Sequence, residues 1–179
     1  MSKLFSQSKA TFISVIAATA IAFTGATFAG EGKARFKPGP DTIAAIAVGN
    51  GSFTTLVAAL SCTGLVGAVA DPEAELTVFA PNDEAFGRLQ LDASNVCAAF
   101  DSATLTDILL YHVVAERRPS PSVVNGMNKE IETLLGEMLY PAGMGSLEIG
   151  ANNSTVNVVA PDILASNGII HVIDFVLLP

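Results

Sequence analysis

The apolar positions near the start of the domain recur with helical spacing. In "DTIAAIAVGNGSFTTLVAAL", which begins at Asp41, they lie three and four residues apart on both sides of a Gly-Asn-Gly break. The second group consists of Phe53, Leu56, Val57 and Leu60. This pattern predicts a helix, a turn and a second helix, with Ser52 as the N-cap of the second.

The pattern then changes to that of a strand. Residues 76–80 read "LTVFA", as expected for a buried strand, and Pro81 ends the run. Asn82 is placed to cap a short helix with Asp83 and Glu84 in its first turn. Acidic side chains at that position face the positive end of the helix dipole, so we interpret them as helix-start residues.

Helices dominate the first half of the domain and strands the second. "SNVCAAF" and "DSATLTDILLYHVV" are predicted helical, whereas the chain from "KEIETLLG" onward is rich in strands and turns. The final run alternates between two mostly apolar faces after an Asn167-Gly168 turn, as in an interior strand that continues to Leu178. The order of elements predicts an α+β fold rather than a parallel α/β sheet.

The chain has two histidines, and we predict that both are interior. His112 continues the helical spacing of the apolar residues before it, and His171 lies within the predicted interior strand. A buried imidazole needs a partner, because a bare ring nitrogen costs about 1–3 kcal/mol. We expect the hydrogen-bond partner of His112 to be Asn82, Asp83 or a backbone group of "APNDEAF". Asn82 is therefore predicted, like the two histidines, to be a structural polar residue of the core.

No catalytic or metal-binding motif is recognisable. Two separated histidines and two cysteines are a poor zinc ligand set. The sequence contains no GxSxG, P-loop or GxGxxG motif, and the histidine nearest to candidate acids, His112, is predicted buried. We therefore predict no enzymatic activity, no cofactor and no metal.

Residues 1–29 have the features of a secretory signal peptide. Lys3 and Lys9 precede an uncharged apolar stretch that ends in small residues, and cleavage is predicted after Ala29. The alternative is an uncleaved anchor, since the 19 uncharged residues of this stretch just reach spanning length. Residues 30–39, rich in Gly, Pro and basic residues, are expected to form a flexible lead-in to a domain over residues 40–179.

The charge of the chain excludes two classes of partner. Removing residues 1–29 leaves 7 basic against 17 acidic residues, and no basic run is longer than Arg117-Arg118. Nucleic acids and anionic membrane surfaces attract clustered Lys and Arg, so we expect neither nucleic-acid binding nor membrane insertion after cleavage. The expected location is secreted: extracellular, at the cell surface, or in a bacterial periplasm.

Cys62 and Cys97 both lie in the predicted mature chain. Export to an oxidising compartment permits a disulfide between them. Closing the loop of 35 residues that separates the two cysteines would stabilise the fold by roughly 3–4 kcal/mol. The alternative is a pair of free, buried thiols that behave as small hydrophobic groups. We favour the disulfide. Because no CxxC motif occurs, neither cysteine is expected to be redox-catalytic.

Four segments, "GSFTTLVAAL", "LTVFAPNDEAFGRL", "LTDILLYHVV" and "ILASNGIIHVIDFVLLP", occur in this order and together resemble a fasciclin (FAS1) domain. The resemblance covers roughly Pro40 to Pro179. It implies a β-wedge or sandwich-like sheet with helices packed around it. It also implies a secreted or displayed module that adheres to a protein, cell-surface or matrix partner without catalysis.

The resemblance further implies candidate partner-binding residues. The family's tyrosine-histidine motif is Tyr111-His112 here, and the Asp-Ile pair to which integrin interaction is attributed in animal matrix members is Asp162-Ile163. Asp162 is expected in a loop after Pro161, either as an exposed contact or as a turn residue. The chain departs from the family at Ala160, where an acidic residue is common, and in its cysteine pair, which many members lack.

The alternative function is that of a carrier for a small apolar ligand. Some fasciclin-type proteins bind carotenoids, and this chain is 50% hydrophobic and only 15% charged. Such a site would be a groove lined by Leu, Ile, Met and Phe, with Met127, Met138 and Met144 as candidates. Loop packing is the simpler interpretation of these methionines.

Overall fold

The computed structural model describes residues 39–124, 130–142, 148–151 and 154–179. The chain separates into two units, Met1–Ala34 and Arg35–Pro179, and the described residues belong to the second. The predicted signal peptide and all but the last residue of the lead-in therefore lie outside the described residues. Within those residues, no helix combines the length and apolar character needed to cross a bilayer.

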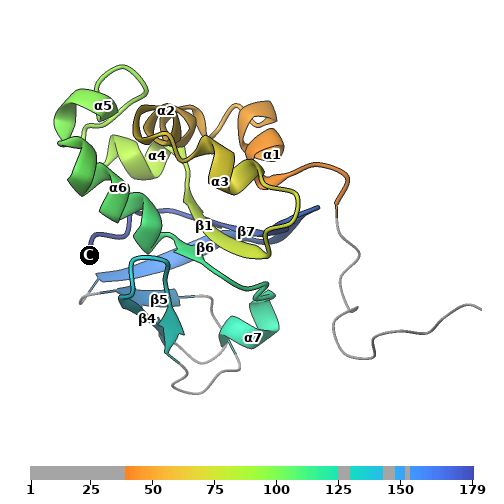
Figure 1. Ribbon diagram of the computed structural model, residues 1–179. Coiled ribbons are helices and arrows are strands. Elements are labelled where there is room, and N and C mark those ends of the chain that lie inside the picture. The colour runs from red at the N-terminus through yellow and green to blue at the C-terminus, as the bar shows by residue number, and fades with distance from the viewer. Residues whose placement is uncertain (1–38, 125–129, 143–147, 152–153) are drawn as a thin grey trace, which may run out of the picture. The chain divides into compact units, whose positions relative to one another are not determined.

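Six short helices form a layer on one face of a sheet (Figure 1). They are α1 (Ile43–Gly49), α2 (Thr54–Thr63), α3 (Val66–Ala70), α4 (Asp83–Gly87), α5 (Val96–Ala99) and α6 (Ser102–Tyr111). The predicted helix, turn and helix after Asp41 is confirmed as α1 and α2. Ser52 is not the N-cap of α2, because Phe53 occupies that position and makes no side-chain cap.

The seven-stranded sheet contains a single parallel pair among the described strands. Its strands are β1 (Leu76–Pro81), β2 (Val113–Val114), β3 (Ile131–Glu132), β4 (Met138–Ala142), β5 (Glu148–Ala151), β6 (Ser154–Ala165) and β7 (Gly168–Ile173), in the order β2-β1-β7-β6-β5-β4-β3. β1 runs parallel to β7, and the other pairs are antiparallel. A seventh helix, α7 (Ser120–Val124), lies below the sheet in Figure 1. This mixed sheet with segregated helices confirms the α+β prediction.

Two apolar clusters lie on opposite faces of the central strands. The helix-side core lies between the sheet and α1, α2, α3 and α6, and it includes Phe53, Leu56, Leu109, Ile170 and Val172. The α7-side core consists of Phe79, Tyr111, Val114, Val123, Ile131, Leu139, Val156, Ile173 and Leu177. Ile170 and Val172 of β7 belong to the helix-side core and Ile173 to the α7-side core. Every residue of β7 is buried, which confirms the predicted interior strand, although β7 ends at Ile173 rather than at Leu178.

The β6–β7 turn also fixes two helices. It consists of Ser166 and Asn167, so it begins one residue before the predicted Asn167-Gly168 turn. The side chain of Asn167 is fully buried and accepts a hydrogen bond from the Ile43 N–H (2.9 Å) at the start of α1. It also donates to the carbonyl of Val69 (3.0 Å) at the end of α3. A Cβ at Gly168 would lie 2.2 Å from the Leu76 carbonyl oxygen, so this position requires glycine.

Candidate functional site

His112 is a buried structural residue at the end of α6, with only 2% of its surface exposed. Its Nδ1 lies 2.7 Å from the Ile108 carbonyl oxygen, and the Leu177 N–H donates to its Nε2 (3.0 Å). A carbonyl only accepts and an amide N–H only donates, so the ring is the neutral tautomer with its proton on Nδ1. Burial lowers the pKa of His112 to about 4. Neither nitrogen is free to act as a base.

Asn82 and Asp83 are not the partners of His112, contrary to the expectation from the sequence. Asn82 is half-buried and caps α4 by accepting from the Ala85 N–H (2.8 Å), as predicted. The Asp83 carboxylate instead reaches α2, where it accepts from the N–H groups of Thr54 (3.2 Å) and Thr55 (2.8 Å). It therefore provides the N-cap that had been expected from Ser52.

The hydrogen bonds of Asp83 also set its ionisation. Burial by itself raises the pKa of Asp83, but hydrogen bonds from Thr55 and Thr54 outweigh it and hold the pKa below the ordinary value. The side chain is therefore a carboxylate at neutral pH. Asp83 is 28 residues from Thr55 and 29 from Thr54 along the chain, which explains why the local pattern did not reveal these contacts.

His171 is fully buried in β7 and has the opposite tautomer to His112. Its Nε2 donates to the Arg118 carbonyl (2.8 Å), while its Nδ1 accepts from the Asp162 N–H (3.2 Å). The ring stacks on Phe79, with the ring centres 5.5 Å apart. Burial lowers the pKa of His171 below that of an exposed histidine.

Asp162 does not lie in a loop before the last strand, so that expectation is wrong. It lies inside β6, within the second of two register shifts between β6 and β7, the one between Ala160 and Ile163. Its φ of 57° is in the left-handed region, which is uncommon for a residue other than glycine. Its carboxylate accepts from the N–H (2.8 Å) and the hydroxyl of Ser120 at the start of α7. Asp162 therefore joins β6 to α7.

The other two predicted contact residues are partly or wholly covered. Ile163 is half-buried and pairs with Ile170 of β7. Tyr111 is fully buried in the α7-side core, and its hydroxyl lies 3.5 Å from the Met138 carbonyl oxygen. Burial raises the pKa of Tyr111. The structure thus gives Tyr111 no surface with which to contact a partner.

Ser120, Asp162 and His171 lie close together and are the residue types of a hydrolase triad, but their hydrogen bonds do not form one. In a triad the serine hydroxyl donates to the imidazole, and the carboxylate accepts from the other ring nitrogen. Here the Ser120 hydroxyl donates to Asp162, and both nitrogens of His171 are bound to backbone groups. The imidazole is therefore not placed to take the serine proton as it does in a triad. Across the described part of the chain, no three His, Cys, Asp or Glu side chains are grouped as metal ligands.

Residues 51–179 match the Fasciclin domain family. The chain belongs to this family. It is 39% identical over 140 residues to Protein sll1483 of Synechocystis sp., an alignment that covers 77% of this chain and 73% of that protein.

Two further relatives confirm the fold and differ in size from this chain. Transforming growth factor-beta-induced protein ig-h3 of Sus scrofa is 35% identical over 147 residues, which is 79% of this chain but only 20% of that protein. The solved FAS1 domain pair of the insect cell adhesion molecule Fasciclin I matches with a TM-score of 0.67 at 20% identity, covering 78% of this chain and 51% of that one. The expected fasciclin fold is therefore confirmed.

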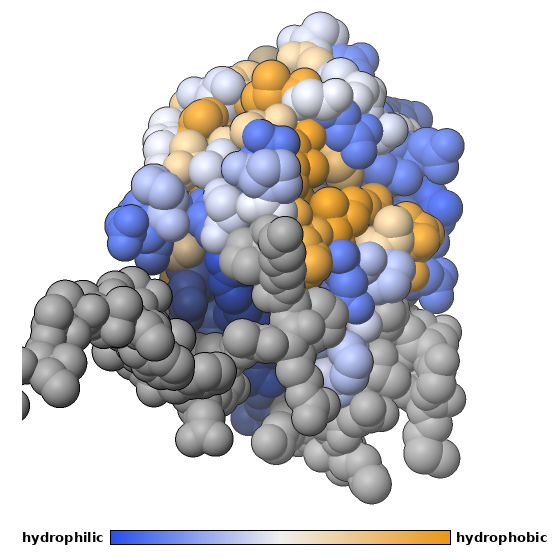
Figure 2. Space-filling view, turned by 90° about the vertical axis from the view of Figure 1, so that its right-hand side faces the viewer, coloured by the Kyte–Doolittle hydropathy of each residue, from blue (hydrophilic) through white to orange (hydrophobic). Residues whose placement is uncertain are grey.

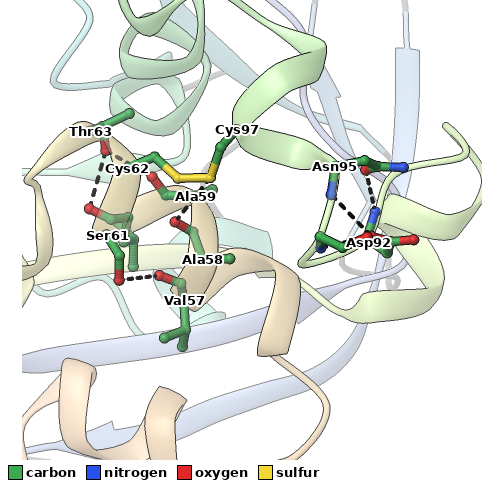
Figure 3. The surroundings of a disulfide bond; sticks show 11 residues. Val57, Ala58, Ala59, Ser61, Cys62, Thr63, Asp92, Asn95 and Cys97 are labelled. Carbon is green, nitrogen blue, oxygen red and sulfur yellow. Dashed lines mark hydrogen bonds between the residues drawn. A yellow bond between two sulfur atoms is a disulfide. The ribbon is translucent and has the colours of Figure 1, made fainter.

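A disulfide between Cys62 and Cys97 joins α2 to α5 in this fasciclin domain (Figure 3). The two Cα atoms are 6.0 Å apart, a distance ordinary for a disulfide. Both cysteines are exposed, so the alternative of two buried free thiols is wrong. In the turn before α5, Asp92 and Asn95 accept hydrogen bonds from each other's N–H groups at 3.1 and 2.8 Å.

The helix-side core leaves a cavity of about 20 Å³ beside His112. Its other lining residues are all apolar: Ile43, Ala47, Phe53, Leu56, Leu60, Val69, Val78, Ala80, Leu109, Val113 and Ile170. The volume suits about one water molecule, which would need two or more polar partners. Since both nitrogens of His112 are already bonded, we expect the cavity to be dry.

Proposed function

We propose that this fasciclin domain is an exported interaction module that binds a protein, cell-surface or matrix partner through its outer surface, without catalysis. The observation that carries the proposal is the engagement of both imidazoles and of the Asp162 carboxylate in hydrogen bonds within the fold. These groups hold chain segments together, which leaves recognition to exposed side chains. The description of the structurally similar Fasciclin I as an insect cell adhesion molecule supports the same assignment.

The bulged part of β6 is the contact surface that we propose. Val159 is 54% exposed, Pro161 is exposed, and the half-buried Asp162 and Ile163 lie beside them. A bulge redirects side chains that a regular strand would point alternately to the two faces of the sheet, and bulges are frequent beside active sites. The bonds of Asp162 to Ser120 and His171 would then preorganise this surface, so that binding costs less conformational entropy.

The test compares two exposed valines. The purified domain is labelled and titrated onto intact cells or extracellular matrix of the organism that makes it. We expect Val159→Ser to weaken binding about tenfold, equivalent to about 1.4 kcal/mol. Val48→Ser is the matched control, because Val48 is 68% exposed but lies on α1. Saturable binding that Val159→Ser leaves unchanged would contradict the β6 surface, and absence of saturable binding would contradict the module itself.

A second candidate function is the carriage of an apolar ligand on the surface. Figure 2 shows apolar atoms gathered in a patch on the side of the molecule that faces right in Figure 1. The cavity of about 20 Å³ is far too small for a carotenoid, so the ligand would lie in a surface groove. Of the three candidate methionines, Met138 is half-buried in β4, while Met127 and Met144 lie outside the described residues.

The carrier function has a direct test. Protein purified from its native source should absorb above the protein band if it carries a coloured ligand, and solvent extraction with mass spectrometry should detect a colourless lipid in stoichiometric amount. A native preparation without bound pigment or lipid would exclude the carrier and leave the interaction module in place.

We also propose that the protein is secreted after cleavage at Ala29. N-terminal sequencing of protein recovered from the medium or periplasm should begin at Gly30. A chain that keeps Met1 and fractionates with membranes would instead identify residues 11–29 as an anchor.

A further inference from the structure

We propose that protonation of His171 moves the Asp162 carboxylate from Ser120 to the imidazolium and thereby frees α7 from the sheet. The switch would be built from three groups that lie together but come from β7, from the β6 bulge and from the start of α7. It does not depend on the identity of any partner. Its effect would be to uncover part of the α7-side core in acid.

Among the described residues, helix α7 is held by the Asp162 side chain, by Val123 and by packing against β4. The Asp162 carboxylate accepts from the N–H (2.8 Å) and the hydroxyl of Ser120, and Val123 inserts into the α7-side core. The segment leading to α7 is fixed separately: the Thr77 hydroxyl accepts from the Arg118 N–H (2.7 Å) and donates to the Glu116 carbonyl (2.6 Å). Loss of the Asp162–Ser120 bonds would therefore release α7 while the segment before it stays in place.

The tautomer of His171 determines what protonation does. The neutral ring accepts from the Asp162 N–H at Nδ1 (3.2 Å) and donates from Nε2 to Arg118 (2.8 Å). A proton added at Nδ1 would face the Asp162 N–H, so two donors would oppose each other and this bond would break. The bond from Nε2 to Arg118 would remain.

A new acceptor for the added proton lies on the same residue. The Asp162 carboxylate is close enough to raise the pKa of His171 electrostatically, although burial has the larger effect and keeps that pKa below its ordinary value. An imidazolium and a carboxylate form a stronger, charge-assisted hydrogen bond than the one lost. A carboxylate that turns toward His171 must leave Ser120. The left-handed backbone of Asp162, uncommon outside glycine, depends on the same bonds and would relax with them.

Among the described residues, the other charged groups near His171 are engaged elsewhere. In the segment before α7, the Arg118 guanidinium pairs with Glu116, and the Arg117 guanidinium donates to the carbonyls of the β6–β7 turn, including Ser166. β1 contributes the uncharged Phe79 and Thr77 to this side of the sheet. Helix α7 itself, with the sequence SPSVV, carries no titratable side chain.

Amide hydrogen exchange of the mature protein, resolved by residue and corrected for intrinsic rates, tests the switch. Between pH 7.5 and pH 5 we expect the protection of the Ser120 and Asp162 amides to fall at least about tenfold more than that of amides in α2 and α6, which report the stability of the whole domain. In His171→Gln, which retains a donor and an acceptor but cannot titrate, the Ser120 amide should show no such pH dependence. His112→Gln is the matched control and should respond to acid as the wild type does.

Two results would overturn the proposal. One is wild-type protection at Ser120 that stays parallel to α2 and α6 down to pH 5. The other is an unchanged acid response in His171→Gln. If that variant does not fold, the wild type is measured by NMR: the signal of the Asp162 carboxyl carbon must move as His171 Nδ1 gains its proton, at the pH where Ser120 loses protection. A carboxyl carbon signal that does not follow the protonation of His171 would contradict the transfer of the carboxylate.

Discussion

His112 and His171 are both buried and neutral, yet they hold the protein together in different ways. His112 lines the cavity of the helix-side core, carries its proton on Nδ1 and links α6 to Leu177 near the C-terminus. His171 stacks on Phe79 of the α7-side core, carries its proton on Nε2 and links β7 to two separate segments.

The difference lies in what each ring can do when it gains a proton. Both partners of His112 are backbone groups, so an imidazolium there would leave the Leu177 N–H facing another donor. His171 has the Asp162 carboxylate next to it. We therefore expect acid to destabilise the whole domain through His112 and to rearrange a limited region through His171.

The largest effect is expected from His112→Ala. The substitution removes two buried hydrogen bonds and enlarges an existing cavity, so the free energy of unfolding should fall by about 3–5 kcal/mol. Urea unfolding monitored by circular dichroism measures it. Val48→Ala, at an exposed site on α1, should change it by less than about 0.5 kcal/mol. An unchanged stability of His112→Ala would remove the structural role assigned to this ring.

Loss of the disulfide should act on the whole domain rather than on the His171 region. The Cys62→Ser, Cys97→Ser double variant opens a 35-residue loop and should lower the free energy of unfolding by about 3–4 kcal/mol. The exchange protection of the Ser120 amide relative to amides in α6 should stay the same. Neither α2 nor α5 contributes a residue to the Asp162–Ser120 bonds or to the α7-side core. A selective loss of protection at Ser120 would show that the two regions are coupled.

The pH dependence of the free energy of unfolding tests the role assigned to His112. The pKa of His112 is about 4 in the folded protein and near 6.5 in an unfolded chain. The stability gained from its neutral form is therefore complete above pH 6.5 and is lost as the pH falls toward 4. The loss from this ring should be on the order of 3 kcal/mol. Urea unfolding of wild type and His112→Gln across this range measures it, and parallel curves would contradict the assignment.

A smaller effect is expected where Asp83 caps α2. Asp83→Ala removes hydrogen bonds to Thr54 and Thr55, so stability should fall by about 1–2 kcal/mol at pH 7. Because the pKa of Asp83 is lowered in the fold, the contribution should be present at neutral pH and disappear as the carboxylate is protonated. Ser52→Ala is the control and should be nearly neutral. A larger loss in Ser52→Ala than in Asp83→Ala would restore Ser52 as the cap.

Local periodicity predicted the elements well because each helix or strand buries a face that its own residues determine. The spacing around Leu56 located α2, and the alternation around His171 located β7 as a strand with two buried faces. Asn82 was identifiable as a cap because its partner, Ala85, is three residues away. The disulfide was favoured from the cysteines and the predicted export alone.

The contacts that build the candidate site join residues far apart in the chain, and no local pattern encodes them. Asp162 was placed in a loop because Pro161 suggests a break, whereas β6 continues through it as a bulge. Its bond to Ser120 spans 42 residues, and the bond of Asn167 to Val69 spans 98. Tyr111 was taken as a contact from the family resemblance, although its place on the inner side of α6 buries it.

The central claim is that both imidazoles are neutral, internally bonded parts of the scaffold. Nitrogen-15 NMR of the imidazole rings at pH 7 tests it most directly. We expect two neutral rings with opposite tautomers at pH 7, His112 protonated at Nδ1 and His171 at Nε2. A ring that titrates near pH 6.5, or exchanges between tautomers as a solvent-exposed histidine does, would contradict it.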